Sequence, residues 1–317
     1  MNTLDSRQPL ITVVICTYNR YNVLETCLRS FEIQSLAQDE FEVVIVDNSE
    51  DEVGQKRFWS GLELSSNWSL IIEKTPGLSR ARNIGLNVAR GPLVCFIDDD
   101  ALAPSEWLAE IVDVFATRPE CGIAGGPVVP IWPVSRPQWL HKWQEGFLSI
   151  VDLGKSLRPL SDSEWLAGTN IAFRRDLLVQ VGGFSEALGR VKGTLLSNEE
   201  LVVSRKIHEL GYKSYYSPSA RVSHRVHADR VSQAWMRQRA AWQAVSDLMA
   251  GNGAGRDQKE LWSDVGNYLM SLEPEMRGLR GLFLDTMDST LFHKQCDAVG
   301  SLLHLLLRAA GDPDPGP

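Results

Sequence analysis

The chain has 317 residues, with 32 Lys and Arg against 40 Asp and Glu, and a formal net charge of −8. Its 44% apolar and 23% charged residues are typical of a globular protein and exclude an intrinsically disordered chain. The acidic balance disfavours a dedicated DNA or RNA binder, whose phosphate contacts need a basic face, so we expect no nucleic-acid partner.

The N-terminal part of the chain alternates strands with helices. Apolar runs rich in β-branched residues predict buried parallel strands at 10–16, 41–46, 69–73 and 93–97. Helical spacing of apolar residues follows at 22–31, 78–89 and 106–116. This order predicts an α/β fold of Rossmann-like type with a mainly parallel sheet.

Polar clusters stand directly after three of these strands, at 17–20, 47–49 and 98–100. The carboxyl ends of parallel strands meet at one edge of a sheet, where ligands bind in such folds. We therefore predict the functional site at this edge.

The pattern changes along the rest of the chain. Residues 126–165 are rich in Pro and Trp, and we expect an irregular segment that covers the site. Further elements are predicted as strands at 166–173, 213–216 and 221–223 and as helices at 175–181 and 199–210. From 232 to 310 the pattern is helical, with breaks at 251–255 and 278–281 that give about three helices.

Three regions follow from these patterns. We predict an α/β catalytic domain over residues 1–228, an α-helical C-terminal region over 229–310 and a disordered tail over 311–317.

The five cysteines lie far apart and form no C-x-x-C pair, which disfavours a zinc ribbon or a thioredoxin motif. We expect free, buried thiols in a reducing compartment. The polar N-terminus lacks the apolar stretch of a signal peptide, and no apolar run reaches the roughly 20 residues of a membrane-spanning helix. We therefore expect a cytoplasmic protein without a transmembrane segment.

Two common nucleotide-binding motifs are absent. No Gly-x-Gly-x-x-Gly follows the first strand, and the chain contains no Gly-x-x-x-x-Gly-Lys-Ser/Thr. NAD-dependent and P-loop chemistry are therefore disfavoured, and the missing phosphate loop also disfavours a nucleotidyltransferase. A nucleotide whose diphosphate is neutralised by a metal stays compatible with the sequence.

Three aspartates, Asp98, Asp99 and Asp100, end the fourth strand. Carboxylates this close are costly to ionise together without a cation. Alternate residues of a strand point the same way, so Asp98 and Asp100 can share one ion, and oxygen ligands suit Mg²⁺ or Mn²⁺. The competing interpretation is a solvated acidic loop or a helix start.

A series of short motifs runs through residues 10–225. They are ITVVICTYNR (11–20), VVIVDNS (43–49), SRARNIG (79–85), FIDDD (96–100), WLAGTNIAFRR (165–175), VGGF (181–184), NEE (198–200), GY (211–212) and SPSARVSH (217–224). Each is weak alone, but in this order they resemble the family 2 glycosyltransferases of GT-A fold. The resemblance implies a metal-assisted, inverting transfer of a sugar from a nucleoside-diphosphate donor, UDP-linked, to a hydroxyl acceptor.

The resemblance also implies roles for individual residues. Donor and nucleotide contacts would come from Thr17, Tyr18, Arg20, Asp47, Asn48, Arg82, Asn83, Asp98 and Asp99. Asp47 would bond the base, although it could also cap the following turn. Arg80 and Arg82 cannot share one face of a helix, and we expect Arg82 to point inward.

The metal would be bound by Asp100 and Asp98, with His224 completing the ligand set unless it is structural. The acceptor or donor pocket would be lined by Gly168, Asn170 and Trp165. The competing interpretation is that Gly168 and Asn170 only shape the end of a strand and that Trp165 only packs. Trp132, Trp139 and Trp143 precede them, and their aromatic faces suit either sugar stacking or packing.

The catalytic base is the main departure from the family pattern. The usual motif is Glu-Asp with Asp as the base, whereas this chain has Asn198-Glu199-Glu200. If Glu199-Glu200 matches the family's Glu-Asp in order, Glu200 is the base. If instead the family's spacing to the arginine of the following helix is kept, Glu199 is the base. We prefer Glu200. A non-catalytic nucleotide-sugar-binding protein is the alternative that this departure suggests.

The expected partners are a nucleoside-diphosphate sugar and a glycan, lipid-linked or small-molecule hydroxyl acceptor. The C-terminal helices, with an apolar stripe at Leu302–Leu307 interrupted by His304, leave open packing on the catalytic domain, an acceptor site, a homodimer and peripheral contact with a membrane.

Overall fold

The computed structural model describes residues 8–251 and 258–310, so the predicted tail at 311–317 lies outside the described residues. The chain forms two compact units. Unit 1 comprises Met1–Ile131, Ser149–Glu186 and Glu199–Arg225, and unit 2 comprises Trp132–Leu148, Ala187–Asn198 and Val226–Pro317. The predicted domain boundary at 228 stays a prediction, because two segments before it also group with the C-terminal helices.

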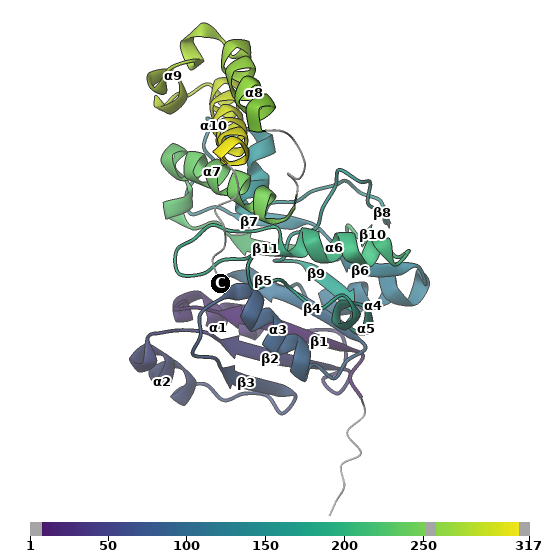
Figure 1. The fold of residues 1–317 in the computed structure, drawn as a ribbon. Coiled ribbons are helices and arrows are strands. Elements are labelled where there is room, and N and C mark those ends of the chain that lie inside the picture. The colour runs from purple at the N-terminus through teal and green to yellow at the C-terminus, as the bar shows by residue number, and fades with distance from the viewer. Residues whose placement is uncertain (1–7, 252–257, 311–317) are drawn as a thin grey trace, which may run out of the picture. The chain divides into compact units, whose positions relative to one another are not determined.

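An eight-stranded sheet forms the centre of unit 1, in the order β3-β2-β1-β4-β9-β6-β10-β8 (Figure 1). The strands are β1 (Ile11–Thr17), β2 (Phe41–Asp47), β3 (Trp68–Ile72), β4 (Leu93–Asp98), β6 (Cys121–Gly125), β8 (Arg158–Pro159), β9 (Ile171–Arg174) and β10 (Lys213–Tyr216). The first four pair in parallel, as do β6 and β10, whereas β9 runs antiparallel to both neighbours. The sheet is therefore mainly parallel, as predicted.

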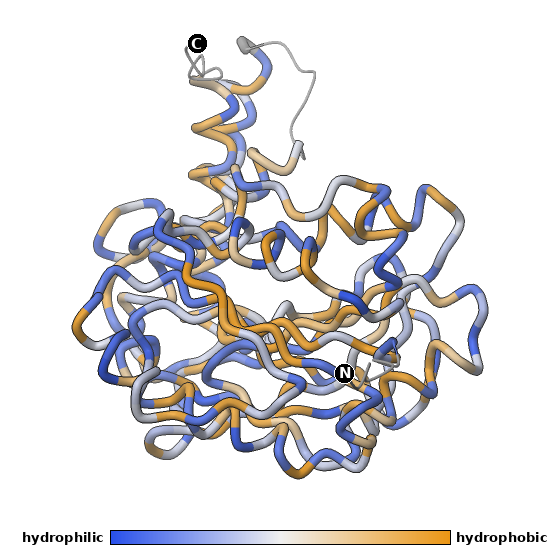
Figure 2. Tube along the Cα trace, turned by 90° about the horizontal axis from the view of Figure 1, so that it is seen from below, coloured by the Kyte–Doolittle hydropathy of each residue, from blue (hydrophilic) through white to orange (hydrophobic). Residues whose placement is uncertain are grey.

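Helices cover both faces of this sheet. They are α1 (Tyr21–Glu32), α2 (Glu52–Ser60), α3 (Leu78–Val88), α4 (Trp107–Thr117), α5 (Arg175–Gln180) and α6 (Glu199–Glu209). Apolar residues of β1 alternate between the faces: Val13 packs in a cluster with α1 and α4, and Val14 packs in another with α3, α5 and α6. Figure 2 shows the central strands as orange, hydrophobic stretches. Because helices cover both faces of the sheet, these strands consist of short unbroken apolar runs.

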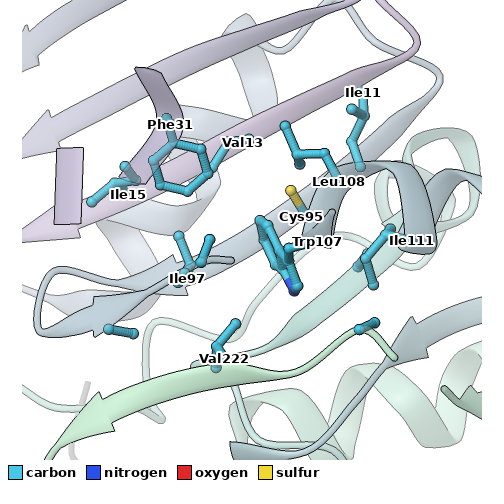
Figure 3. Packing of buried hydrophobic residues seen from close by; sticks show 14 of the residues in the cluster. Ile11, Val13, Ile15, Phe31, Cys95, Ile97, Trp107, Leu108, Ile111 and Val222 are labelled. Carbon is cyan, nitrogen blue, oxygen red and sulfur yellow. The ribbon is translucent and has the colours of Figure 1, made fainter. Parts of the chain in front are cut away.

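Figure 3 shows the first of these clusters. Trp107 and Leu108 of α4 lie among Ile11, Val13 and Cys95 of the sheet, and all five are essentially inaccessible to solvent. The packing fixes β1 and β4 side by side, and these are the strands whose carboxyl ends carry the polar clusters.

Unit 1 also contains a second sheet, of three strands in the order β5-β11-β7. Its strands are β5 (Ala101–Leu102), β11 (Val222–Arg225) and β7 (Val128–Ile131). β5 directly follows the Asp triplet, and its antiparallel pairing places His224 opposite Ala101. This register brings a histidine from late in the chain beside Asp100.

Unit 2 is helical. Its elements are η1 (Lys142–Leu148), η2 (Ala228–Arg230), α7 (Gln233–Met249), α8 (Gln258–Ser271), η3 (Pro274–Met276), α9 (Leu279–Phe283) and α10 (Ser289–Ala310). The α10 helix packs against α7 and α8. A Cβ atom on Gly300 would lie 3.3 Å from the carbonyl oxygen of Ala240, so α10 and α7 approach closely at that point.

Most predicted elements are confirmed within one or two residues. The strand predicted at 166–173 is shorter, since only 171–174 is extended and the residues before it turn. The segment 126–165 is not wholly irregular, because it holds β7, η1 and β8. All five cysteines are free, and four are buried. Among the described residues, no helix is both long and apolar enough to cross a membrane.

Candidate active site

The strand register assembles the site at the predicted edge. Thr17 at the end of β1 lies opposite Asp47 of β2, and Cys16 lies opposite Asp98 of β4. The polar clusters that follow these strands therefore meet in space, although they are separated by tens of residues along the chain.

Asp98, Asp100 and His224 form a candidate metal group. One ligand atom from each lies within 4.8 Å of the others, and His224 Nε2 is 3.1 Å from Asp100 Oδ1. Asp100 and His224 are buried, and the Arg225 amide donates to the Asp100 carbonyl over 2.9 Å, which holds β11 against the triplet. Two carboxylates and an imidazole fit a divalent cation such as Mn²⁺ or Mg²⁺.

Asp99 points away from this group, toward protein donors. Its carboxylate accepts from Thr17 Oγ1 over 2.7 Å and from Arg20 Nη1 over 3.2 Å. The same Arg20 nitrogen lies 2.7 Å from Asp100 Oδ2. Burial raises the pKa of Asp99 to about 7, with the Asp100 charge adding to the rise and the Arg20 charge opposing it. Arg20, expected at the nucleotide end, is thus bonded to two of the three aspartates.

Arg82 links the aspartates to the acid pair of α6. Its Nη1 lies 2.9 Å from Glu199 and 3.0 Å from Glu200, and its Nη2 lies 3.8 Å from Asp98. Burial lowers the pKa of Arg82, but the three carboxylates raise it more, and the net shift is upward. As expected, Arg82 points inward while Arg80 is more exposed.

The two glutamates differ in accessibility. The side chain of Glu199 is 4% exposed and that of Glu200 is 16% exposed. Glu200 therefore presents a carboxylate that another molecule can reach, whereas Glu199 is enclosed beside Arg82.

The turn before β9 completes this region. A Cβ atom on Gly168 would lie 1.9 Å from Glu200 Oε1 and 2.4 Å from Arg82 Nη2, so a larger residue there would force this pair to shift. Thr169 Oγ1 donates a short hydrogen bond to Asp98 Oδ2. Thr169 was not among the predicted site residues, although it stands between two of them, Gly168 and Asn170.

Asp47 is buried and held by protein donors. Its Oδ2 accepts from Tyr21 Oη over 2.8 Å and from Trp59 Nε1 over 2.6 Å, and its Oδ1 accepts from the Ser49 amide over 3.0 Å. The sequence did not predict these two aromatic partners. Trp59 lies on α2, which buries no residue fully and gives a weak helical pattern, and Tyr21 is the first residue of α1.

Several other predicted site residues carry structural bonds. Asn48 bonds the backbone of Glu73, Thr75 and Gly77. Asn83 exchanges two hydrogen bonds with the backbone of Phe184. Asn170 is fully buried between the Trp107 indole and the carbonyls of Pro127 and Ala220.

Two aromatic candidates, Trp165 and Tyr18, are each partly accessible to solvent. Trp165 is half-buried against the apolar cluster on the α1 and α4 face. Tyr18 is also half-buried, and its hydroxyl donates to Glu50 Oε2 over 2.7 Å.

Comparison with known proteins agrees with this geometry. The family model described as Glycosyl transferase family 2 matches residues 12–182. The chain is 29% identical over 244 residues to a glucosyl-dolichyl phosphate glucuronosyltransferase of Haloferax volcanii, covering 74% of this chain and 75% of that protein. It is 26% identical to the succinoglycan biosynthesis protein ExoM of Rhizobium meliloti, covering 72% and 71%.

A solved structure supports the fold. The mannosyltransferase PcManGT of Pyrobaculum calidifontis, in complex with GDP-Man and Mn²⁺, superimposes with a TM-score of 0.58 at 21% identity, covering 96% of this chain and 86% of that one. The fold is therefore of GT-A type with C-terminal helices.

Proposed function

The chain belongs to glycosyl transferase family 2, whose model spans more than half of it, and we propose that it transfers a sugar with inversion from a UDP-linked donor to a hydroxyl acceptor. One observation carries the proposal. A candidate metal group, a buried arginine and an accessible glutamate converge at the carboxyl edge of the sheet, from Asp98, Asp100, His224, Arg82 and Glu200.

The leaving group of this reaction is a nucleoside diphosphate, and its growing negative charge must be stabilised. Asp98, Asp100 and His224 would hold a divalent cation, Mn²⁺ or Mg²⁺, which supplies that charge stabilisation when bound. Arg20 fixes the second oxygen of Asp100, so it orients this ligand. A contact with the diphosphate is a further proposed role of Arg20.

Glu200 is the proposed general base. Its carboxylate takes the proton of the acceptor hydroxyl while the acceptor oxygen attacks the anomeric carbon and the bond to the diphosphate oxygen breaks. Its greater exposure compared with Glu199 supports this choice. Arg82 bonds Glu200 and so sets the position of the carboxylate.

Asp47 stays a proposed contact of the donor base. In the structure its Oδ2 accepts from Tyr21 and Trp59, and among the described residues its Oδ1 accepts from the Ser49 amide. The proposed acceptor is a glycan, lipid-linked or small-molecule hydroxyl. A lipid-linked glycan is supported by the name of the Haloferax relative.

The test is release of nucleoside diphosphate from a panel of UDP- and GDP-linked sugars, with Mn²⁺, with Mg²⁺ and with neither. We expect metal-dependent release of UDP that falls by about 10²–10⁴-fold in Glu200→Gln. Glu209→Gln removes the same charge from an exposed position on the same helix and should leave the rate unchanged.

Other outcomes contradict the proposal in distinct ways. Donor binding without release, with any acceptor, would favour the non-catalytic alternative. Release of pyrophosphate would indicate nucleotidyl transfer. Loss of activity in Glu199→Gln but not in Glu200→Gln would exchange the roles of the two acids.

A further inference from the structure

Unit 2 contains a cavity of about 670 Å³ that takes no part in the chemistry proposed above. It is lined by residues of η1, α7, α8 and α10, all within this unit. Its volume lies in the range of small-molecule sites in proteins. Its lining therefore decides which class of ligand it fits.

An exposed tryptophan belongs to this lining. Trp143 of η1 is 79% exposed, which leaves a large flat apolar side chain in water. Its neighbour Trp139 is used differently, since it packs edge-on against Phe292 with ring centroids 5.1 Å apart. Packing thus accounts for Trp139 but not for Trp143. Phe147 and Tyr268 add two more aromatic rings to the lining.

Fixed polar groups face the same space. Asp247 Oδ1 accepts from Asn198 Nδ2 and from Gln243 Nε2, each over 2.8 Å. The Tyr268 hydroxyl lies 3.5 Å from Asp297 Oδ2. These amides and carboxylates offer pairs of donors and acceptors at set positions.

A buried amide in the lining has only a weak acceptor for its N–H groups. Gln144 is 2% exposed, and its Oε1 accepts from the His141 amide over 3.1 Å. Its Nε2 has no nitrogen or oxygen acceptor among the described residues, and the Gln144 side chain interacts with the Cys296 thiol, which is a weak acceptor. Because the N–H groups of a buried amide normally have strong acceptors, this group can also donate to a bound molecule.

The charge of the lining limits which class of ligand the cavity can bind. Asp247 and Asp297 are carboxylates, and no lysine or arginine is among the described residues that line the cavity. An anion such as a phosphate or a uronate would meet repulsion there. More than half of the lining residues have side chains that hydrogen-bond, which disfavours a hydrocarbon chain.

We propose that this cavity binds a neutral saccharide unit, with Trp143 stacking on the C–H face of the sugar and Gln144, Asp247 and Asp297 bonding its hydroxyls. Stacking buries the exposed indole face, and sugar hydroxyls both donate and accept, so they match amides and carboxylates together. The proposal does not depend on the transfer reaction, because it concerns binding by unit 2 alone.

The experiment measures binding to the whole chain by saturation-transfer NMR and calorimetry. The neutral probes are methyl glycosides of glucose, galactose, mannose and N-acetylglucosamine and their disaccharides, with methyl glucuronide as the anionic and choline as the cationic comparison. We expect saturable binding of at least one neutral glycoside. Trp143→Ala should weaken it at least tenfold.

Trp262→Ala is the matched control, because Trp262 is 51% exposed on α8 and does not line the cavity. It should leave binding unchanged. Asp297→Asn, at an exposed position, should weaken binding without affecting folding. Absence of binding by every neutral probe, tighter binding of glucuronide or choline, or equal effects of the two tryptophan variants would overturn the proposal. UDP binding with Mn²⁺, measured in the same variants, tests the donor site separately.

Discussion

The acidic edge of unit 1 and the cavity of unit 2 both present carboxylates, but among the residues that the structure describes only those of the first are paired with arginines. Asp99 and Asp100 meet Arg20, and Glu199 and Glu200 meet Arg82. In the cavity, amides and a tyrosine hydroxyl contact the acids instead. Acids balanced by arginines and a candidate metal group suit a multiply charged diphosphate, whereas acids surrounded by neutral donors suit an uncharged ligand.

The largest effect should come from the metal group. Asp100→Asn keeps the shape of the side chain but removes the charge that a divalent cation needs, so metal-dependent release of nucleoside diphosphate should fall by about 10³-fold or more. The stabilisation of the protein by UDP with Mn²⁺ in thermal melts should also disappear, and chelation with EDTA should reproduce the loss. Asp113→Asn, exposed on α4, is the control. Full activity of Asp100→Asn would remove the metal from the reaction.

The second prediction tests the arginine pairing. Arg82→Met removes the buried guanidinium that bonds Glu199 and Glu200, and this should lower the free energy of unfolding by about 3–5 kcal/mol in urea titrations. Arg80→Met removes a half-exposed guanidinium from the same helix and should change it by no more than about 1 kcal/mol. Equal, small effects would mean that the buried network contributes little to folding.

The third prediction concerns the space beside that network. Gly168→Ala places a methyl group against Glu200 and Arg82, which must then separate or shift. A displacement of the base by about 1 Å is expected to lower kcat by about 10²-fold, with a loss of about 1–3 kcal/mol in stability.

Gly266→Ala in α8 is its control, because nothing lies within 4 Å of the added Cβ atom. It should raise stability by up to about 1 kcal/mol through helix propensity. An unchanged kcat in Gly168→Ala would show that Glu200 has no fixed position in catalysis.

How far the sequence predicts these features depends on how local they are. β1, β2 and β4 are nearly unbroken apolar runs, so the local sequence alone predicts where they lie in the chain and which polar residues follow their carboxyl ends. Asp98, Asp100 and His224 were named from motifs, and the structure groups them. β6 escaped prediction because its sequence, CGIAG, is short and contains two glycines.

The remaining features depend on contacts between distant segments. Arg82 pairs with Glu199 and Glu200, which lie 117 and 118 positions later in the chain, and the sequence around Arg82 does not predict this pairing. The roles of Asn48, Asn83 and Asn170 in bonding the backbone likewise need the fold. The cavity of unit 2 forms only when four helical segments pack together. The sequence around Trp139 and Trp143 therefore does not distinguish a tryptophan that packs from one that binds a sugar.

The smallest effect is expected for Asp297→Asn. The side chain is exposed and lies 3.5 Å from the Tyr268 hydroxyl, and its charge also acts on the partly buried His293, so no fully buried charge loses a partner. The free energy of unfolding should change by less than about 0.5 kcal/mol, at both low and high salt. A loss of several kcal/mol that salt reduces would mean that a cation is paired with this acid. The cavity would then be electrostatically similar to the edge of unit 1, and the choice of a neutral ligand would lose its basis.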